Sequence, residues 1–173
     1  MQRLAACDAE AVLDAFDRGV RLPRPLSPHA AAALSGTTIE LDALVQMIEA
    51  EPAGDRWIVE GAGGVLVPIN ESDLMVDLIA RLGLPVVVVA RSGLGTINHT
   101  LLTLEALGAR SLAVAGLVLV GSPNDENRRA IEFYGRTRVV GELPVLEPFG
   151  PDALGRWADN ELDADSHLLE YLR

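Results

Sequence analysis

The sequence contains no lysine, and all 14 of its basic residues are arginine. Schiff-base chemistry, covalent attachment of pyridoxal phosphate and a lysine general base are therefore excluded within these 173 residues. A complete phosphate-binding loop of the GxxxxGKS/T type is excluded as well, because the lysine of that motif reaches the nucleotide phosphates.

Cysteine, positive charge and long apolar runs are also scarce. The single cysteine, Cys7, cannot form an internal disulfide, which favours a cytoplasmic location. A formal net charge of −11 without any basic cluster argues against a nucleic-acid partner, since phosphate contacts need gathered cations. The longest apolar run, residues 84–90, is far shorter than the roughly 20 residues of a membrane span, so no membrane association is expected.

Hydrophobic patterning predicts an α/β fold in one domain over residues 1–173. Continuous apolar runs typical of strands buried on both faces occur at residues 85–90 and 112–120, and shorter strands are expected at 56–59 and 138–140. Helices are expected after a proline-rich connector at 21–29 and at residues 8–18, 40–50, 73–81, 96 or 98 to 108, 125–134 and 166–172. Strands that alternate with helices predict a mostly parallel sheet with right-handed crossovers.

Three polar or glycine-rich loops follow predicted strands, at residues 60–64, 91–98 and 121–127. Ligands of such sheets bind outside the carboxyl ends of the strands, so a site built from all three loops is expected. In the first loop, the Glu60 carboxylate suits Mg²⁺, and the glycines let backbone N–H groups approach an anion. The alternative is a glycine-rich turn in which Glu60 caps a neighbouring helix.

The second loop opens directly into a helix, whose free N–H groups and positive dipole end suit a carboxylate or a phosphate. The alternative is a flexible turn with Thr96 or Asn98 as the N-cap. His29 and His99 have no metal-ligand spacing and are expected to be structural. Asp8 is expected to be an N-cap, with a metal-ligand role as the alternative. Spacing alone predicts an α/β enzyme that binds an anion.

Two longer motifs carry a resemblance to a known family. Val59-Glu60-Gly61-Ala62-Gly63-Gly64-Val65-Leu66-Val67-Pro68 and Gly93-Leu94-Gly95-Thr96-Ile97-Asn98-His99-Thr100-Leu101-Leu102-Thr103 resemble the signatures of dethiobiotin synthetases. Shorter matches at residues 25–29, 123–132 and 141–144 follow in the order of that family, and the resemblance runs from about Asp8 to Leu146. It implies a three-layer α/β sandwich like that of P-loop nucleotide hydrolases, without the first strand–loop–helix unit of the family.

The resemblance also implies a reaction. Members of the family are ligases that form carbon–nitrogen bonds in biotin biosynthesis. They use CO₂, Mg²⁺ and ATP to close the ureido ring on 7,8-diaminopelargonic acid, and they act as homodimers. Carried over by motif, Asp8 and Glu60 hold the metal. The nucleotide is bound by Asp8, Glu60, Gly61, Ala62, Gly63, Gly121, Pro144, Val145 and Leu146, and the substrate by Leu94, Gly95 and Asn98. No catalytic side chain is assigned within these residues.

Two departures from the family pattern have consequences. Val120 stands where several members place an asparagine that reads the adenine edge, and valine cannot make that hydrogen bond. The phosphate-binding loop and its lysine do not precede Asp8. Three explanations are open: an upstream start, a second chain that supplies the loop, or a non-catalytic relative that keeps the fold and the substrate and dimer surface but has lost ATP chemistry. The 173 residues alone are predicted to turn over very poorly.

Overall fold

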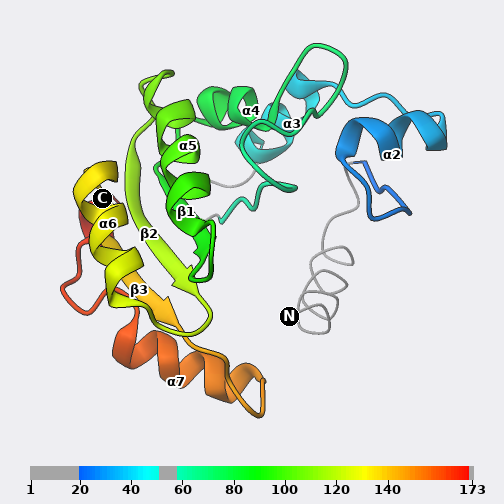
Figure 1. Cartoon of the computed structure of the whole chain (residues 1–173). Coiled ribbons are helices and arrows are strands. Elements are labelled where there is room, and N and C mark those ends of the chain that lie inside the picture. The colour runs from blue at the N-terminus through cyan, green and yellow to red at the C-terminus, as the bar shows by residue number, and fades with distance from the viewer. Residues whose placement is uncertain (1–19, 51–57, 172–173) are drawn as a thin grey trace. The chain divides into compact units, whose positions relative to one another are not determined.

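The computed structural model describes residues 20–50 and 58–171, drawn as the coloured ribbon in Figure 1. The chain divides into two compact units, of which the first ends at Leu84 and the second covers the residues from Pro85 onward. The helix expected over residues 8–18 lies outside the described residues, as do Asp8 and Trp57. The single domain over residues 1–173 stays a prediction.

The unit from Pro85 onward contains the sheet. Strands β1 (Val86–Arg91), β2 (Val114–Val120) and β3 (Val139–Leu143) are parallel and lie in the order β1-β2-β3. Helix α5 (Thr96–Gly108) connects β1 to β2, and helix α6 (Asp125–Gly135) connects β2 to β3. This confirms the predicted α/β class and the parallel sheet.

Helices cover both faces of this sheet. Right-handed crossovers between neighbouring parallel strands place α5 and α6 on the same face (Figure 1). On the other face, helix α7 (Pro151–Glu161) packs Trp157 against Val118 and Val140, and the 3₁₀ turn η1 (Leu168–Tyr171) adds Leu168 to the same cluster. The unit is therefore a three-layer arrangement, as expected.

The two apolar strand runs differ in burial, which corrects one expectation. The five central residues of β2 are all buried, as predicted. In β1, however, Val87 is 42% exposed and Val89 is 65% exposed. Within this unit α7 and η1 pack over β2 and β3, so nothing from them covers this face of the edge strand. A continuous β-branched run therefore did not mean burial on both faces.

The end of the chain differs most from expectation. Strand β3 runs on to Leu143, whereas the sequence suggested an end at residue 140, because Leu143 still pairs with Val120 of β2. The helix expected over residues 166–172 is the short turn η1. Helix α7 was missed, although Pro151 stands at its start, where proline is favoured because the missing N–H has no partner there anyway.

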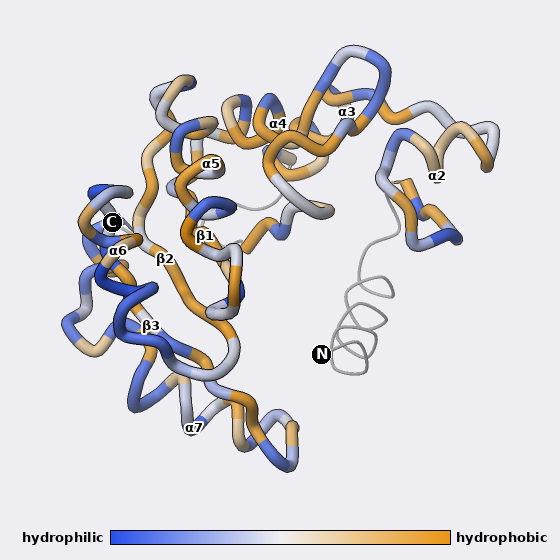
Figure 2. The backbone as a smooth tube through the Cα atoms, in the orientation of Figure 1, coloured by the Kyte–Doolittle hydropathy of each residue, from blue (hydrophilic) through white to orange (hydrophobic). Residues whose placement is uncertain are grey.

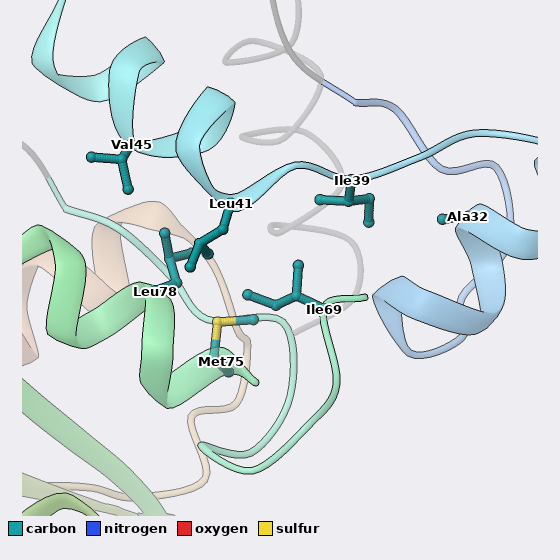
Figure 3. Close-up of a cluster of buried hydrophobic side chains, with 7 residues drawn as sticks. All are labelled: Ala32, Ile39, Leu41, Val45, Ile69, Met75 and Leu78. Atoms are coloured by element: carbon teal, nitrogen blue, oxygen red, sulfur yellow. The ribbon is translucent and has the colours of Figure 1, made fainter. Parts of the chain in front are cut away.

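Within its described residues, the other unit, here called the helical unit, contains three short helices, α2 (Pro28–Ser35), α3 (Leu41–Glu49) and α4 (Met75–Leu82), and these confirm the helices predicted there. Their apolar faces meet in one cluster, in which Figure 3 shows the side chains of Leu41, Leu78, Met75 and Ile69 pointing toward one another. Ile69 lies in the connection before α4, so this cluster also anchors the segment that follows the glycine-rich loop. The members are Ala32, Ile39, Leu41, Val45, Ile69, Met75 and Leu78.

The strand expected over residues 56–59 is not formed by the residues that the structure describes. Ile58 and Val59 lie outside any strand, and Ile58 is 96% exposed. A β-branched pair has strand propensity, but a strand also needs a neighbouring strand that supplies the hydrogen-bond ladder. Arg56 and Trp57 lie outside the described residues.

Hydropathy follows the layers of the sheet-containing unit. Figure 2 shows β2 as a mainly hydrophobic stretch and α6 as a mainly hydrophilic helix. Helix α6 buries Ile131 and exposes the charged residues Asp125, Glu126 and Arg129, while β2 forms the centre of the sheet. None of the helices in the described ranges has the length and apolar character needed to cross a membrane.

Candidate functional site

The glycine-rich loop of residues 60–64 lies in the helical unit, and its conformation depends on glycine. Gly63 has a φ of +92°, which L-residues rarely adopt, and its N–H donates to the Gly61 carbonyl at 3.0 Å. A Cβ at Gly63 would lie 3.1 Å from Val67 Cγ2, and one at Gly61 would lie 3.3 Å from Met75 Cγ. The loop is thus folded tightly onto the residues that follow it.

Backbone hydrogen bonds tie this loop to the start of α4. The Val76 N–H donates to the Val65 carbonyl at 2.8 Å, and the Met75 N–H donates to the Val67 carbonyl at 2.9 Å. The Asp77 carboxylate accepts from the Leu74 N–H at 2.8 Å and closes the first turn of the helix. The buried side chain of Met75 connects these bonds to the apolar cluster. The loop therefore sits on a rigid base.

Glu60 precedes the glycines with an exposed carboxylate. Among the described residues it forms no ion pair or hydrogen bond, so it caps none of the described helices. An exposed and unpaired carboxylate beside glycine backbone fits one ligand position of a hard cation such as Mg²⁺, which keeps several waters and binds phosphate oxygens. Within the described ranges no group of three or more metal-ligating side chains gathers, and Asp8 lies outside them.

The second loop, residues 92–98, leaves the carboxyl end of β1 and enters α5. Its N-cap is Gly95, with a φ of +89°, which corrects the expectation of Thr96 or Asn98. A left-handed residue immediately before the helix turns the chain without a side-chain cap, and glycine adopts it without strain. Thr96 is instead buried in the first turn, where its hydroxyl lies 3.4 Å from that of Thr100.

The start of α5 presents free donors. The Thr96 N–H donates a hydrogen bond to the Gly93 carbonyl, and the His99 N–H donates to the Gly95 carbonyl, both at 3.1 Å. The N–H groups of Ile97 and Asn98 have no acceptor within the described part of the chain. Two adjacent free N–H groups at the positive end of a helix dipole are a favourable place for a carboxylate or phosphate.

Leu94 in this loop and His99 in the first turn of α5 have different surroundings. Leu94 is fully exposed, although it is a large apolar residue. His99 Nδ1 accepts a hydrogen bond from Arg91 Nη2 at 3.0 Å, which ties the first turn of α5 to the end of β1. The loop therefore has a fixed base and a projecting apolar tip.

The third loop begins with Gly121 at the end of β2, and it contacts the second. Gly121 has a φ of +125°, and a Cβ there would lie only 2.7 Å from Ser92 Oγ. The Gly121 N–H donates to the Leu143 carbonyl at 2.9 Å, next to Pro144. The structure thus brings together three segments that the sequence analysis treated separately: the start of the loop of residues 92–98, Gly121 and the segment that begins with Pro144.

A pocket of about 440 Å³ lies beside that last segment. Pro144 and Leu146 line it, whereas Val145 is 69% exposed and does not. The opposite wall comes from α7, with Ala153, Arg156, Trp157 and Asn160. Sequence reasoning missed this wall, although Leu154, Trp157 and Ala158 recur at helical spacing after Pro151.

Trp157 fixes the pocket to the sheet. Its ring is buried against Val118 and Val140, and its Nε1–H donates to the Glu142 carbonyl at 2.9 Å. Val120 packs against the same cluster. Val120 therefore contributes to the apolar contact between β2 and α7. It has no side-chain amide that could bind a ligand at this position.

Comparison with known proteins gives this arrangement a family. A model of an AAA domain matches residues 4–153. The protein named ATP-dependent dethiobiotin synthetase BioD from Nitrobacter hamburgensis is 46% identical over 153 residues, which cover 88% of this chain and 68% of that protein. The chain belongs to the dethiobiotin synthetase family.

Two other relatives have a higher sequence identity than this one, and both are longer than the present chain. The enzyme of the same name from Paramagnetospirillum magneticum is 54% identical over 127 residues, 73% of this chain and 60% of that protein. The biotin biosynthesis bifunctional protein BioCD from Bordetella avium is 50% identical over 147 residues, 85% of this chain but 31% of that protein. The matched region thus spans less than two thirds of these two relatives.

Proposed function

We propose that this protein acts in the dethiobiotin synthetase reaction, the Mg²⁺- and ATP-dependent carboxylation and ring closure of 7,8-diaminopelargonic acid with CO₂. The observation that carries the proposal is the carboxyl edge of the sheet. There the free N–H groups in the first turn of α5, Gly121 and the pocket at Pro144 belong to one unit. Gly121 lies against Ser92 at the start of the loop to α5 and bonds to Leu143 before Pro144. The printed names of the relatives supply the reaction.

The substrate's carboxylate binds at the start of α5 in this proposal. Ile97 and Asn98 supply two N–H donors, and Gly95 allows close approach because it has no side chain. The fully exposed Leu94 is suited to contact with a second copy of the chain, where it would lie beside the partner's substrate. This supports the homodimer that the family resemblance implies.

In this proposal the nucleotide base occupies the pocket between Pro144, Leu146 and α7, and Gly121 donates its N–H to the carbonyl of Leu143, the residue before Pro144. Glu60 and Asp8 would hold Mg²⁺, and Gly61, Ala62 and Gly63 would offer backbone groups to the phosphates. When bound, Mg·ATP supplies the phosphoryl group that activates a carbamate made from CO₂ and one amine, so that the second amine closes the ring and phosphate leaves. The chain's own residues position the substrate and exclude wrong orientations.

The absence of lysine bears on a second candidate function. Any lysine that contacts the nucleotide phosphates must come from outside these 173 residues, as on a second chain. The second candidate is therefore a binding protein that keeps the substrate and dimer surface without ATP chemistry. The cytoplasmic location stays a prediction from the single cysteine.

The test uses the protein isolated from its source cells. Native mass spectrometry determines its subunits, titration calorimetry measures the binding of 7,8-diaminopelargonate and of Mg·ATP, and mass spectrometry detects dethiobiotin after incubation with CO₂. We expect both ligands to bind and dethiobiotin to form. The Glu60→Ala variant should weaken Mg·ATP binding at least tenfold and leave diaminopelargonate binding unchanged.

The matched control is Glu71→Ala, which removes another exposed carboxylate of the same unit and should change neither affinity. Diaminopelargonate binding without Mg·ATP binding would favour the binding protein. A protein that binds neither ligand would contradict both functions.

A further inference from the structure

The Asn127 side chain connects the start of α6 to a backbone group 35 residues away. Its Nδ2 donates to the Ser92 carbonyl oxygen at 2.9 Å, and Ser92 is the first residue of the loop that leads to α5. The Asn127 backbone N–H donates to Oδ1 of Asn124, the N-cap of α6, also at 2.9 Å. Asn127 therefore joins a capped helix start to the proposed substrate loop.

Both the backbone N–H and the backbone carbonyl of Ser92 form hydrogen bonds. The residue is 4% exposed, and its N–H donates to the Val120 carbonyl of β2 at 2.9 Å while its carbonyl accepts from Asn127. The next carbonyl, of Gly93, accepts from the Thr96 N–H. Because this turn follows Ser92 directly, the orientation of Ser92 determines where the N–H groups of Ile97 and Asn98 point.

The surroundings leave Ser92 little freedom. Its Oγ lies 2.7 Å from where a Cβ of residue 121 would be, so glycine at that position leaves room for it. Helix α6 is itself fixed, because Nη1 of Arg128, the neighbour of Asn127, forms a 2.9 Å ion pair with the Glu142 carboxylate of β3. The amide of Asn127 thus reaches Ser92 from a fixed helix and not from a mobile loop.

We propose that Asn127 is a positioning residue for substrate binding, whose amide holds the Ser92 carbonyl and thereby aims the N–H groups of Ile97 and Asn98 at the substrate's carboxylate. The identity of that substrate rests on the proposed function. Asn127 acts through the backbone of the loop and touches no substrate itself. Without its hydrogen bond, ligand binding must order the loop, and this cost lowers the affinity.

The experiment compares three variants of the full protein. Asn127→Leu removes the donor at similar size, and Asn127→Gln keeps an amide on a longer arm. Asn124→Ala is the matched control, because it removes the N-cap of the same helix but leaves the bond to Ser92. Titration calorimetry gives the dissociation constants for 7,8-diaminopelargonate and Mg·ATP, and hydrogen exchange with mass spectrometry follows the amides of residues 92–98.

We expect Asn127→Leu to weaken diaminopelargonate binding about fivefold to tenfold, the usual effect of one lost hydrogen bond, with Mg·ATP affinity unchanged. Asn127→Gln should recover part of the loss, and Asn124→Ala should bind like the parent protein. Hydrogen exchange at residues 92–98 should speed up in Asn127→Leu and not in Asn124→Ala. Equal diaminopelargonate affinities in the parent and Asn127→Leu would overturn the proposal, as would parallel losses for both ligands.

The outcomes separate this inference from the proposed function. If the parent protein does not bind diaminopelargonate, the proposed function fails, and hydrogen exchange still measures whether Asn127 orders the loop. Unchanged exchange at residues 92–98 in Asn127→Leu overturns the positioning role in that case as well.

Discussion

The two loops proposed to meet ligands are held in opposite ways. The loop of residues 60–64 depends on its own glycines, on a hydrogen bond from Val67 to Gly64, and on bonds that hold the residues directly after it, such as that from Val76 to Val65. The loop of residues 92–98 depends on Asn127 and Gly121, which lie far along the chain. The comparison shows that one loop is a local structure, while the other is built by the sheet around it.

The apolar interiors of the two units differ in the same sense. In the helical unit, side chains from short helices and one connection meet in a single cluster. In the other unit, β2 lies between two layers, so its side chains contact elements on both faces. Substitutions should therefore have their largest effects in β2 and smaller ones in the loops and at the surface.

The largest effect is expected for Leu117→Ala in β2. Leu117 is fully buried, so truncation leaves a cavity between the sheet and its helices and should cost about 2–5 kcal/mol of unfolding free energy. Urea unfolding followed by far-ultraviolet circular dichroism measures this. Leu102→Ala in α5, where the side chain is 55% exposed, is the control and should change the unfolding free energy by less than about 1 kcal/mol. Similar losses for the two variants would contradict a core centred on β2.

A smaller effect is expected for Gly63→Ala in the glycine-rich loop. The positive φ makes alanine unfavourable by about 1–2 kcal/mol, and the new Cβ presses on Val67. Gly64→Ala is the matched control, because a Cβ there meets nothing within 4 Å. Thermal unfolding of the two variants compares them. If Gly64→Ala lowered the melting temperature as much as Gly63→Ala, the loop would not owe its shape to the backbone of Gly63.

The smallest effects are expected at two ion pairs, one in each unit. Glu142→Gln weakens a pair with Arg128 in which the glutamate side chain is 17% exposed, and should cost about 1 kcal/mol. Asp42→Asn removes a pair with Arg81 whose side chains are both more than half exposed, and should cost less than about 0.5 kcal/mol. Urea unfolding at low and at 1 M salt checks both, because salt screens the exposed pair more strongly. Equal losses of unfolding free energy in the two variants would contradict the expected difference between the two ion pairs.

The local pattern of apolar residues was sufficient to predict most helices and strands in which apolar residues recur regularly. The helices at residues 41–49, 75–82, 96–108 and 125–135 and the buried strand β2 follow from apolar spacing, because a period of 3.6 or a β-branched run reflects the backbone itself. The pattern was insufficient for Ile58 and Val59, which have strand propensity but pair with no strand in the part of the chain that the structure describes. It was also insufficient for α7, which begins at a proline that sequence reasoning did not use.

Some residues of the candidate site could also be predicted from the sequence, and others could not. The motifs identified Glu60 and its glycines, the loop before α5, Gly121 and the segment from Pro144, and the structure puts the last three at one edge of a sheet. The roles of Ser92 and Asn127 were not predicted. Neither residue belongs to a pattern with a chemical meaning of its own, because their function lies in the contact between them.

The sequence by itself determined most of the helices and strands and the parallel arrangement of the sheet, since these depend on periodicity and chain conformation. The tertiary structure decided that β1 exposes Val87 and Val89, that α7 forms the wall of the pocket and that Asn127 holds Ser92. Each of these depends on which elements become neighbours, and a local pattern carries no information about contacts between residues 35 positions apart.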